Sequence, residues 1–351
     1  MLFVHLALPL AFRPKVGGTL GMETKTSCFV SHSARFALLC HFVAKVGGGS
    51  GIQTKTSLFV WNSTHLALPL QRVSNIKQLR MNKQILLIND IAGYGKVATA
   101  AMLPILSYMG LPVYNLPTAL VSNTLDYGKF NILDTTDYIK GVFPVWKELG
   151  FEFDAIATGF IASERQARIV SEYCREQARK GTTIFVDPIM GDEGKLYNGV
   201  TPSTINSMRE MLSVAHLIYP NYTEACYLTD TEYKKDGVTM EEANRLVDAL
   251  CEFGAKSVII TSMMIEGKHC VVGYNHIENT RFQLDYTEIP VHFPGTGDIF
   301  SAVLIGHLLQ GERLEPSTRK AMDAVARLID LNKDNADKNR GIPVENFLSI
   351  I

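Results

Sequence analysis

The 351-residue sequence lacks several features that would assign a protein to a large class at once. No apolar run reaches the ~18 residues that a membrane-spanning helix requires. The six cysteines are scattered and form no CxxC pair, which argues against a metal cluster or a disulfide framework and favours a reducing cytosol. The Walker lysine motif GxxxxGK[ST] is also absent. We therefore expect a cytoplasmic protein that is not embedded in a membrane.

Acidic residues are almost missing from the first eighty positions. That segment carries nine Lys and Arg residues against the single acid Glu23, a net charge of +8. The remaining residues carry 25 basic and 34 acidic side chains, a net charge of −9. Two segments with such different charge are not expected to form one folding unit, and an acidic body does not suit nucleic acid as a partner. We therefore place a domain boundary between residues 80 and 81.

The first eighty residues repeat themselves with a period of 30 residues. Val16–Val30 (VGGTLGMETKTSCFV) corresponds to Val46–Val60 (VGGGSGIQTKTSLFV), and HLALPL occurs twice at double that spacing. The copies are too short and too rich in glycine for a solenoid. A basic, acid-poor composition is typical of transit peptides, but these do not normally repeat. We predict that residues 1–80 are a non-native or disordered leader, translated from repetitive sequence ahead of a native start at Met81.

From Gln84 onward, short apolar runs alternate with stretches of helical periodicity. The predicted strands are Ile85–Ile88, Pro112–Leu116, Ala155–Thr158, Thr183–Val186, Leu217–Tyr219 and Ser257–Thr261, followed by a meander of Cys270–Tyr274, Arg281–Leu284 and Thr287–Val291. The predicted helices are Val97–Met109, Thr136–Leu149, Glu164–Arg179, Glu241–Phe253, Gly297–Gln310 and Pro316–Asn332. This alternation predicts an α/β fold, with a mostly parallel sheet flanked by helices on both faces. Ligands of such folds bind beyond the carboxyl ends of the strands.

The most informative segment is Pro294-Gly295-Thr296-Gly297-Asp298, which precedes an apolar helix. Two glycines allow a tight turn that presents backbone amides, and the helix directs its unpaired N–H groups at the same point. Together these amides can hold a phosphoryl group. Asp298 is then placed to accept the proton of an attacking hydroxyl. A turn followed by a capping aspartate is the alternative for an isolated GxGD segment.

Further blocks of sequence support the catalytic interpretation. The GxGD segment resembles the C-terminal signature of the ribokinase-like kinases. Val186–Asp192 (VDPIMGD) with Gly194–Tyr197 (GKLY) resembles the DPVMGD…GKLY block of the pyridoxal kinase branch, and Pro220–Ala225 (PNYTEA) resembles the PNxxE segment of the superfamily. Leu87–Gly95 (LINDIAGYG) and Leu116–Asn123 (LPTALVSN) are similar to the vitamin-binding edge of the same branch.

This resemblance extends over Met81–Ile351. It implies a ribokinase-like three-layer sandwich that uses ATP and Mg²⁺ to phosphorylate the 5′-hydroxymethyl group of a B6 vitamer (pyridoxal, pyridoxamine or pyridoxine) in vitamin B6 salvage. It leaves open whether a monovalent cation such as K⁺ is needed. It also implies a homodimer, and twofold assemblies are the commonest soluble oligomers.

The resemblance assigns roles to the residues around the phosphoryl group. Asp298 would be the catalytic base, and the amides of Gly295–Gly297 would stabilise the transferred group. Asp187 and Glu224 would bind Mg²⁺ beside ATP, because Mg²⁺ takes oxygen ligands and keeps several waters. For Asp187 the alternative is a turn residue at a strand end, and for Glu224 it is an acid in the first turn of a helix. Asn221 would hold either ATP or the local loop.

The remaining candidates flank these residues. Thr261 ends a predicted strand at a position where the family contacts phosphate, with Ser262 as a substitute. On the vitamin side, Asp90 stands where many relatives have a serine against the pyridine ring, so the preferred vitamer stays open. Thr118 matches a threonine that contacts the ring. Phe160 stands where an aromatic side chain stacks on the substrate, and a buried core phenylalanine is the alternative.

Two other functions stay open on the sequence alone. A hydroxymethylpyrimidine kinase of thiamine synthesis shares the fold, the GxGD segment and an aromatic hydroxymethyl substrate. The GKLY and LPTALVSN segments favour a B6 vitamer over that pyrimidine. A non-catalytic homologue that binds the vitamin or a nucleotide would retain the pocket without turnover. The intact Asp298 and both loop glycines argue against such a homologue.

Overall fold

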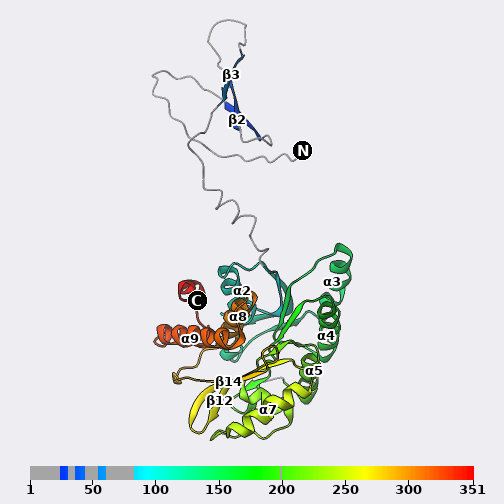
Figure 1. The fold of residues 1–351 in the computed structure, drawn as a ribbon, viewed down its shortest axis with the longest axis vertical. Coiled ribbons are helices and arrows are strands. Elements are labelled where there is room, and N and C mark those ends of the chain that lie inside the picture. Colours follow the sequence, from blue (N-terminus) through cyan, green and yellow to red (C-terminus); the bar gives the residue numbers. More distant parts are fainter. Residues whose placement is uncertain (1–23, 31–35, 44–53, 61–82, 198–199) are drawn as a thin grey trace. The chain divides into compact units, whose positions relative to one another are not determined.

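The structure is a computed structural model that describes residues 24–30, 36–43, 54–60, 83–197 and 200–351 (Figure 1). It divides into two compact units, Met1–Leu79 and Arg80–Ile351. The described part of the first unit is an antiparallel sheet with the strand order β1-β2-β3. Its strands are β1 (Thr24–Val30), β2 (Phe36–Val43) and β3 (Thr54–Val60). β1 and β3 are equivalent segments of the two repeat copies, and the leader assignment for residues 1–80, most of which lie outside the described residues, stays a prediction.

The second unit is built on a nine-stranded sheet with the order β14-β13-β12-β11-β8-β7-β4-β5-β6. The six strands from β12 to β5 run parallel, whereas β13, β14 and β6 pair antiparallel at the two edges. The strands are β4 (Ile85–Tyr94), β5 (Val113–Asn123), β6 (Ile132–Asp134), β7 (Ala155–Thr158), β8 (Thr183–Val186), β11 (Leu217–Ile218), β12 (Ser257–Ile265), β13 (Lys268–Asn275) and β14 (Thr280–Asp285). A separate hairpin is formed by β9 (Gly191–Asp192) and β10 (Lys195–Leu196).

Helices cover both faces of this sheet (Figure 1). One face carries α3 (Thr136–Leu149), α4 (Glu164–Arg179), α5 (Pro202–Leu212), α6 (Tyr222–Thr229) and α7 (Met240–Glu252). The other face carries α2 (Thr99–Tyr108), α8 (Thr296–Leu309) and α9 (Leu314–Asn332). Short 3₁₀ helices occupy Leu125–Tyr127, Val344–Asn346 and Leu348–Ile350. None of the helices in the described part of the chain combines the length and hydropathy needed to span a membrane.

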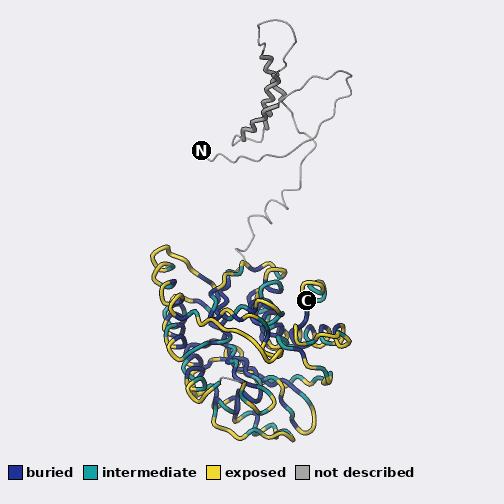
Figure 2. The backbone as a smooth tube through the Cα atoms, turned by 180° about the vertical axis from the view of Figure 1, so that it is seen from behind, coloured by how far each residue is buried: buried dark blue, intermediate teal, exposed yellow. Residues whose placement is uncertain are grey.

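Alternate residues of the central strands point into two separate cores. In β4, Leu86 and Ile88 belong to the core under α3–α7, whereas Ile85 and Leu87 belong to the core under α2, α8 and α9. This alternation with apolar residues on both sides is the pattern of a parallel sheet buried on both faces. Figure 2 shows the buried segments inside the second unit and the exposed segments on its outer surface. The predicted three-layer α/β sandwich is confirmed.

Several predicted elements agree with the structure and others do not. α3, α4, β7 and β8 have the predicted bounds to the residue, whereas β4 and β5 continue well past the predicted ends. The predicted strand Thr287–Val291 is wrong, because that segment is irregular in the structure. Pro290 has no N–H for a ladder, and the Val291 N–H turns back to the Ile289 carbonyl at 2.7 Å. α5 and α6 were not predicted.

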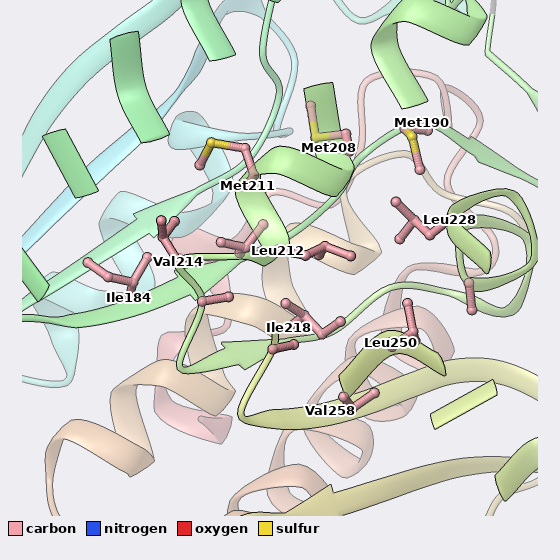
Figure 3. Close-up of a cluster of buried hydrophobic side chains, with 14 of the residues drawn as sticks. Ile184, Met190, Met208, Met211, Leu212, Val214, Ile218, Leu228, Leu250 and Val258 are labelled. Carbon is pink, nitrogen blue, oxygen red and sulfur yellow. The ribbon is translucent and has the colours of Figure 1, made fainter. Parts of the chain in front are cut away.

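The core under α3–α7 allows a matched test of packing (Figure 3). Leu250 on α7 is fully buried, whereas Leu331 on α9 is 51% exposed. We expect Leu250→Ala to lower the free energy of unfolding by about 2.7–5.0 kcal/mol, through lost apolar burial and the cavity that is left. Leu331→Ala should change the free energy of unfolding by no more than about 0.5 kcal/mol. Urea unfolding of the two variants measures both values, and similar losses would contradict the packing described.

Candidate active site

Residues selected from the sequence meet near the carboxyl ends of the parallel strands. Asp90 lies in β4, Asp187 directly follows β8, and Asp298 enters from the first turn of α8. Electrostatic repulsion connects them: Asp298 raises the pKa of both Asp90 and Asp187, and Asp187 in turn raises the pKa of Glu224. The carboxyl groups are therefore neighbours although the sequence separates them widely.

Of the two glycines in the loop before α8, the structure requires only Gly295. Gly295 is the N-cap of α8 and has φ 84°. A Cβ atom there would lie 2.3 Å from the Lys96 carbonyl oxygen, so no other residue fits. A Cβ atom on Gly297 would meet no described atom within 4 Å. The Thr296 hydroxyl donates to the Phe293 carbonyl at 3.3 Å, and among the described residues no side chain caps the first turn of α8, so its amides are free to bind an anion.

Asp298 is half-buried and does not cap its own helix. It is the third residue of α8, behind the N-cap Gly295, so the alternative of a capping aspartate is wrong. The Ala98 N–H donates to Asp298 Oδ2 at 2.7 Å. Burial raises the pKa of Asp298 to about 6, although the bonds from Ala98 and from the Asn89 side chain act in the opposite direction. A carboxylate with a pKa near neutrality is suited to general base catalysis.

Asp187 is a second half-buried carboxyl group, and the sequence analysis did not identify the residues that surround it. Burial and the nearby Asp298 raise the pKa of Asp187 to about 8. Ser301 Oγ lies 3.1 Å from Asp187 Oδ2 and donates to it, and it also lies 2.8 Å from the Gly297 carbonyl. The hydroxyl of Tyr219 is buried with no hydrogen-bond partner among the described residues, and its pKa is raised by burial and by Asp187. Ser301 could have been found from its position one turn after the GxGD segment.

Glu224 occupies the third position of α6 and forms a reciprocal capping box with Asn221. The Asn221 N–H donates to Glu224 Oε2 at 2.9 Å, and the Glu224 N–H donates to Asn221 Oδ1 at 2.9 Å. The Met190 N–H donates to Glu224 Oε1 at 2.9 Å. Asn221 Nδ2 donates to the Gly191 carbonyl at 2.8 Å, so in this structure it holds the local loop. Glu224 is nevertheless buried, and burial together with Asp187 raises its pKa well above the usual value.

The pair of Asp187 and Glu224 fits Mg²⁺ by the chemistry of its donors. Both groups are carboxylates withdrawn from water, and each would be relieved by a nearby cation. Mg²⁺ takes oxygen ligands and is usually bound by one or two carboxylates with several waters. In the described residues no group of three or more His, Cys, Asp or Glu side chains could form an all-protein cage. A two-carboxylate site of this kind is therefore the one that the residues present can supply.

A hollow of about 300 Å³ is lined by Asp192, Glu193, Tyr197 and His292. Burial and then Glu224 and Asp192 raise the pKa of Tyr197, which connects the hollow electrostatically with the capping box. Burial also raises the pKa of Asp192. Asp192 entered the sequence analysis only as part of a motif, and its position makes it a further candidate at the phosphate side.

Thr261 does not end its strand, contrary to the prediction. β12 continues to Ile265, with a register shift against β13 between Ile260 and Met263. Ser262 lies in that irregularity with φ 55° and is exposed. The Thr261 N–H donates to the Pro220 carbonyl at 3.0 Å, which places Thr261 beside the start of α6. Bulges often re-aim side chains next to functional sites.

Asn89 lies between the candidate vitamin-side residues and Asp298, and the sequence analysis missed it. Its Oδ1 accepts from the backbone N–H groups of Asp90 and Phe160, both at 2.9 Å. Its Nδ2 donates to Met102 Sδ at 3.7 Å, and its amide is close enough to Asp298 to lower the pKa of that carboxyl group. Phe160 is half-buried and belongs to neither described core, so it is not the core phenylalanine of the alternative. Thr118 is fully buried, and its hydroxyl has no partner among the described residues.

The chain is similar in sequence and in fold to several known proteins. The family described as phosphomethylpyrimidine kinase matches residues 117–343. A Bacteroides thetaiotaomicron protein assigned to the phosphomethylpyrimidine kinases has a TM-score of 0.73 at 36% identity, covering 77% of this chain and 94% of its own. Another crystal form of that protein contains pyridoxal. Pyridoxal kinase from Lactobacillus plantarum has a TM-score of 0.68 at 26% identity, covering 76% and 95%. The pyridoxine/pyridoxal/pyridoxamine kinase of Bordetella avium is 29% identical over 256 residues, covering 67% of this chain and 79% of its own.

The two loop glycines offer a matched pair of substitutions. We expect Gly295→Ala to destabilise the protein by more than about 1 kcal/mol, because alanine resists the positive φ and its Cβ would press on the Lys96 carbonyl. Gly297→Ala should leave the free energy of unfolding unchanged or slightly higher, because alanine favours the helix and the space is open. Denaturant unfolding curves of both variants provide the measurement. Equal destabilisation would show that the loop is not arranged as described.

Proposed function

Because the chain belongs to the phosphomethylpyrimidine kinase family and to its pyridoxal kinase branch, we propose that it phosphorylates the 5′-hydroxymethyl group of a B6 vitamer with ATP. The observation that carries the proposal is the half-buried Asp298, held by the Ala98 N–H in the first turn of a helix whose N-terminus has no side-chain cap among the described residues. The pyridoxal in a crystal form of a 36% identical relative favours a B6 vitamer over hydroxymethylpyrimidine. Pyridoxal, pyridoxamine and pyridoxine all carry the required hydroxymethyl group, and the product is the 5′-phosphate used in vitamin B6 salvage.

Each residue around the loop has a physical task in this transfer. Asp298 accepts the proton of the vitamer hydroxyl as its oxygen attacks the γ-phosphorus of ATP. The amides of Gly295–Gly297 and the positive end of the α8 dipole stabilise the charge on the phosphoryl oxygens. The Ala98 N–H holds the Asp298 carboxylate at 2.7 Å, so the base does not have to reorient before the reaction.

Asp187 and Glu224 would hold Mg²⁺ with the triphosphate, with Asn221, Thr261 and Ser262 lining the nucleotide side. Bound there, Mg²⁺ would offset negative charge on the phosphates. Ser301 fixes Asp187, and backbone N–H groups fix Glu224. We extend the proposal to a monovalent cation such as K⁺, because the triphosphate and the four carboxyl groups Asp90, Asp187, Glu224 and Asp298, once ionised, would together carry more negative charge than one divalent ion balances.

The test of the function is turnover by the full-length protein. With Mg-ATP, we expect phosphorylation of at least one of pyridoxal, pyridoxamine and pyridoxine, and a lower rate with hydroxymethylpyrimidine. Asp298→Asn should lower kcat by about 10²–10⁴-fold, because it removes the base while keeping the shape of the side chain. Asp137→Asn is the matched control, since the Asp137 side chain is 87% exposed.

Three results would count against the proposal. Turnover of hydroxymethylpyrimidine alone would agree with the proposed mechanism but would assign the protein to thiamine synthesis. A full rate in Asp298→Asn would remove the assigned base. Binding of ATP and vitamer without turnover in the unmodified chain would favour a non-catalytic homologue.

We also propose a homodimer that forms through the β5–β6 edge and works in the cytoplasm. Leu120 and Leu133 pair across these strands and are 45% and 61% exposed, and Tyr138 at the start of α3 is 60% exposed. Leu133 belongs to the edge strand β6, and exposed apolar side chains on and beside an edge strand are a typical association surface. The cysteines Cys174, Cys226, Cys251 and Cys270 are free, which suits a reducing compartment.

A single substitution that introduces a charge at the proposed interface tests the dimer. Leu133→Lys should weaken association at least about tenfold, because each subunit would bury an ammonium group in place of an apolar side chain. Leu331→Lys, at a comparably exposed leucine on α9, should leave the association constant unchanged. Sedimentation velocity over a concentration series measures both variants, and an unaltered Leu133→Lys dimer would place the interface elsewhere.

A further inference from the structure

The hydroxyl of Tyr219 is buried beside Asp187 without a hydrogen-bond partner. Tyr219 is 3% exposed, and its Oη forms no hydrogen bond within the described part of the chain. Tyr219 directly follows β11 and Asp187 directly follows β8, and these two strands pair in parallel. The Tyr219 N–H donates to the Val186 carbonyl at 3.3 Å, which keeps the two residues side by side. A buried hydroxyl without a partner is unfavourable, so its position next to a proposed metal ligand suggests a partner that is gained on binding.

The side chain of Ser301 connects Tyr219 with Asp187. Ser301 Oγ lies 3.1 Å from Asp187 Oδ2 and 2.8 Å from the Gly297 carbonyl oxygen. Burial and then Asp187 raise the pKa of Tyr219, and the nearby Ser301 hydroxyl lowers it, so the three side chains are neighbours. A serine hydroxyl has one proton and two lone pairs. Ser301 can therefore donate to only one of its two acceptors at a time, and among the described residues it is the one side chain that donates to Asp187.

We propose that Tyr219 is a positioning residue, whose hydroxyl donates to Ser301 Oγ and thereby directs the Ser301 proton to Asp187. As a ligand of Mg²⁺, Asp187 would be a carboxylate, which is a stronger acceptor than the neutral Gly297 carbonyl. With its proton on Asp187, Ser301 Oγ offers a lone pair to the Tyr219 hydroxyl, and successive hydrogen bonds of this kind strengthen one another. The chain of two hydroxyls would hold Asp187 in one orientation toward the metal. This inference rests on the Mg-ATP site of the proposed function.

The test measures ADP binding to the full-length protein by calorimetry, once with Mg²⁺ and once with EDTA. The unmodified protein should bind ADP more tightly with Mg²⁺. Tyr219→Phe removes only the hydroxyl and should weaken binding with Mg²⁺ by about threefold to tenfold, as expected for the loss of one hydrogen bond. Binding in EDTA should not change. In turnover assays, the KM for Mg-ATP should rise by a similar factor, and the KM for the vitamer should stay the same.

Tyr173→Phe is the matched control. Tyr173 lies on α4, is 8% exposed, and also has a hydroxyl without a partner among the described residues. It belongs to the core on the opposite face of the sheet. Neither substitution should lower the thermal midpoint, because each removes an unpaired buried hydroxyl. Only Tyr219→Phe should alter the binding that depends on Mg²⁺, so the comparison separates a positioning role from a structural one.

Ser301→Ala tests the route between the two residues. It should weaken ADP binding with Mg²⁺ by itself, and adding Tyr219→Phe should cause no further loss. Additive losses, an equal effect of Tyr173→Phe, or unchanged binding in Tyr219→Phe would overturn the inference and leave the proposed function intact. ADP binding that Mg²⁺ does not strengthen in the unmodified protein would overturn the inference together with the proposed metal site. A protein that binds Mg-ADP but phosphorylates no vitamer would overturn the proposed substrate alone.

Discussion

Desolvation of carboxyl groups at one edge of the sheet is the constraint on which this site depends. Burial is the largest cause of the raised pKa of Asp90, Asp187, Glu224 and Asp298. The protein offsets it with neutral donors, such as the Ala98 N–H and the Ser301 hydroxyl. None of the ion pairs in the described residues includes any of the four groups. Because buried negative charge without a cation is unfavourable, the proposed ligands would have to supply the charge balance. The arrangement therefore agrees with the proposal that substrate, nucleotide and metal complete the site together.

One neutral amide sets the relative positions of these groups. Asn89 binds the backbone on both sides of the vitamer pocket and reaches the carboxylate of Asp298. Gly159 allows this, because a Cβ atom there would lie 2.4 Å from Asn89 Oδ1. A neutral side chain can hold Asp298 without forming an ion pair that would weaken it as a base. Such buried positioning residues are what keep reacting groups within a fraction of an ångström of a productive arrangement.

The sequence predicted the layers well and the ends of elements near the site less well. α4 was predicted to the residue because Ser163 caps it and its apolar spacing is regular. β4 was predicted to end at Ile88, where the polar residues Asn89 and Asp90 interrupt the apolar run, but pairing with β5 continues past them to Tyr94. Periodicity cannot detect such an extension. For Glu224, an Asn-x-x-Glu pattern is found both in capping boxes and in the PNxxE segment of the superfamily. The structure shows that Glu224 forms a capping box here. The roles assigned to the site residues stay predictions.

The arrangement around Asp298 is fixed by backbone packing more than by side chains. Gly295 and Gly341 each come so close to the Lys96 carbonyl that a Cβ atom would lie 2.3 Å and 2.8 Å from it. Ala98 adopts φ 50°, a strained value that costs ~1–3 kcal/mol in a non-glycine residue. That conformation directs its N–H at the Asp298 carboxylate. The chain segments around Lys96, Gly295 and Gly341 thus meet backbone to backbone, and the hydrogen bond to Asp298, the proposed base, offsets part of the strain at Ala98. This close backbone packing is possible only with glycine at Gly295 and Gly341. The need for glycine at Gly295 explains why the GxGD segment was the most informative part of the sequence.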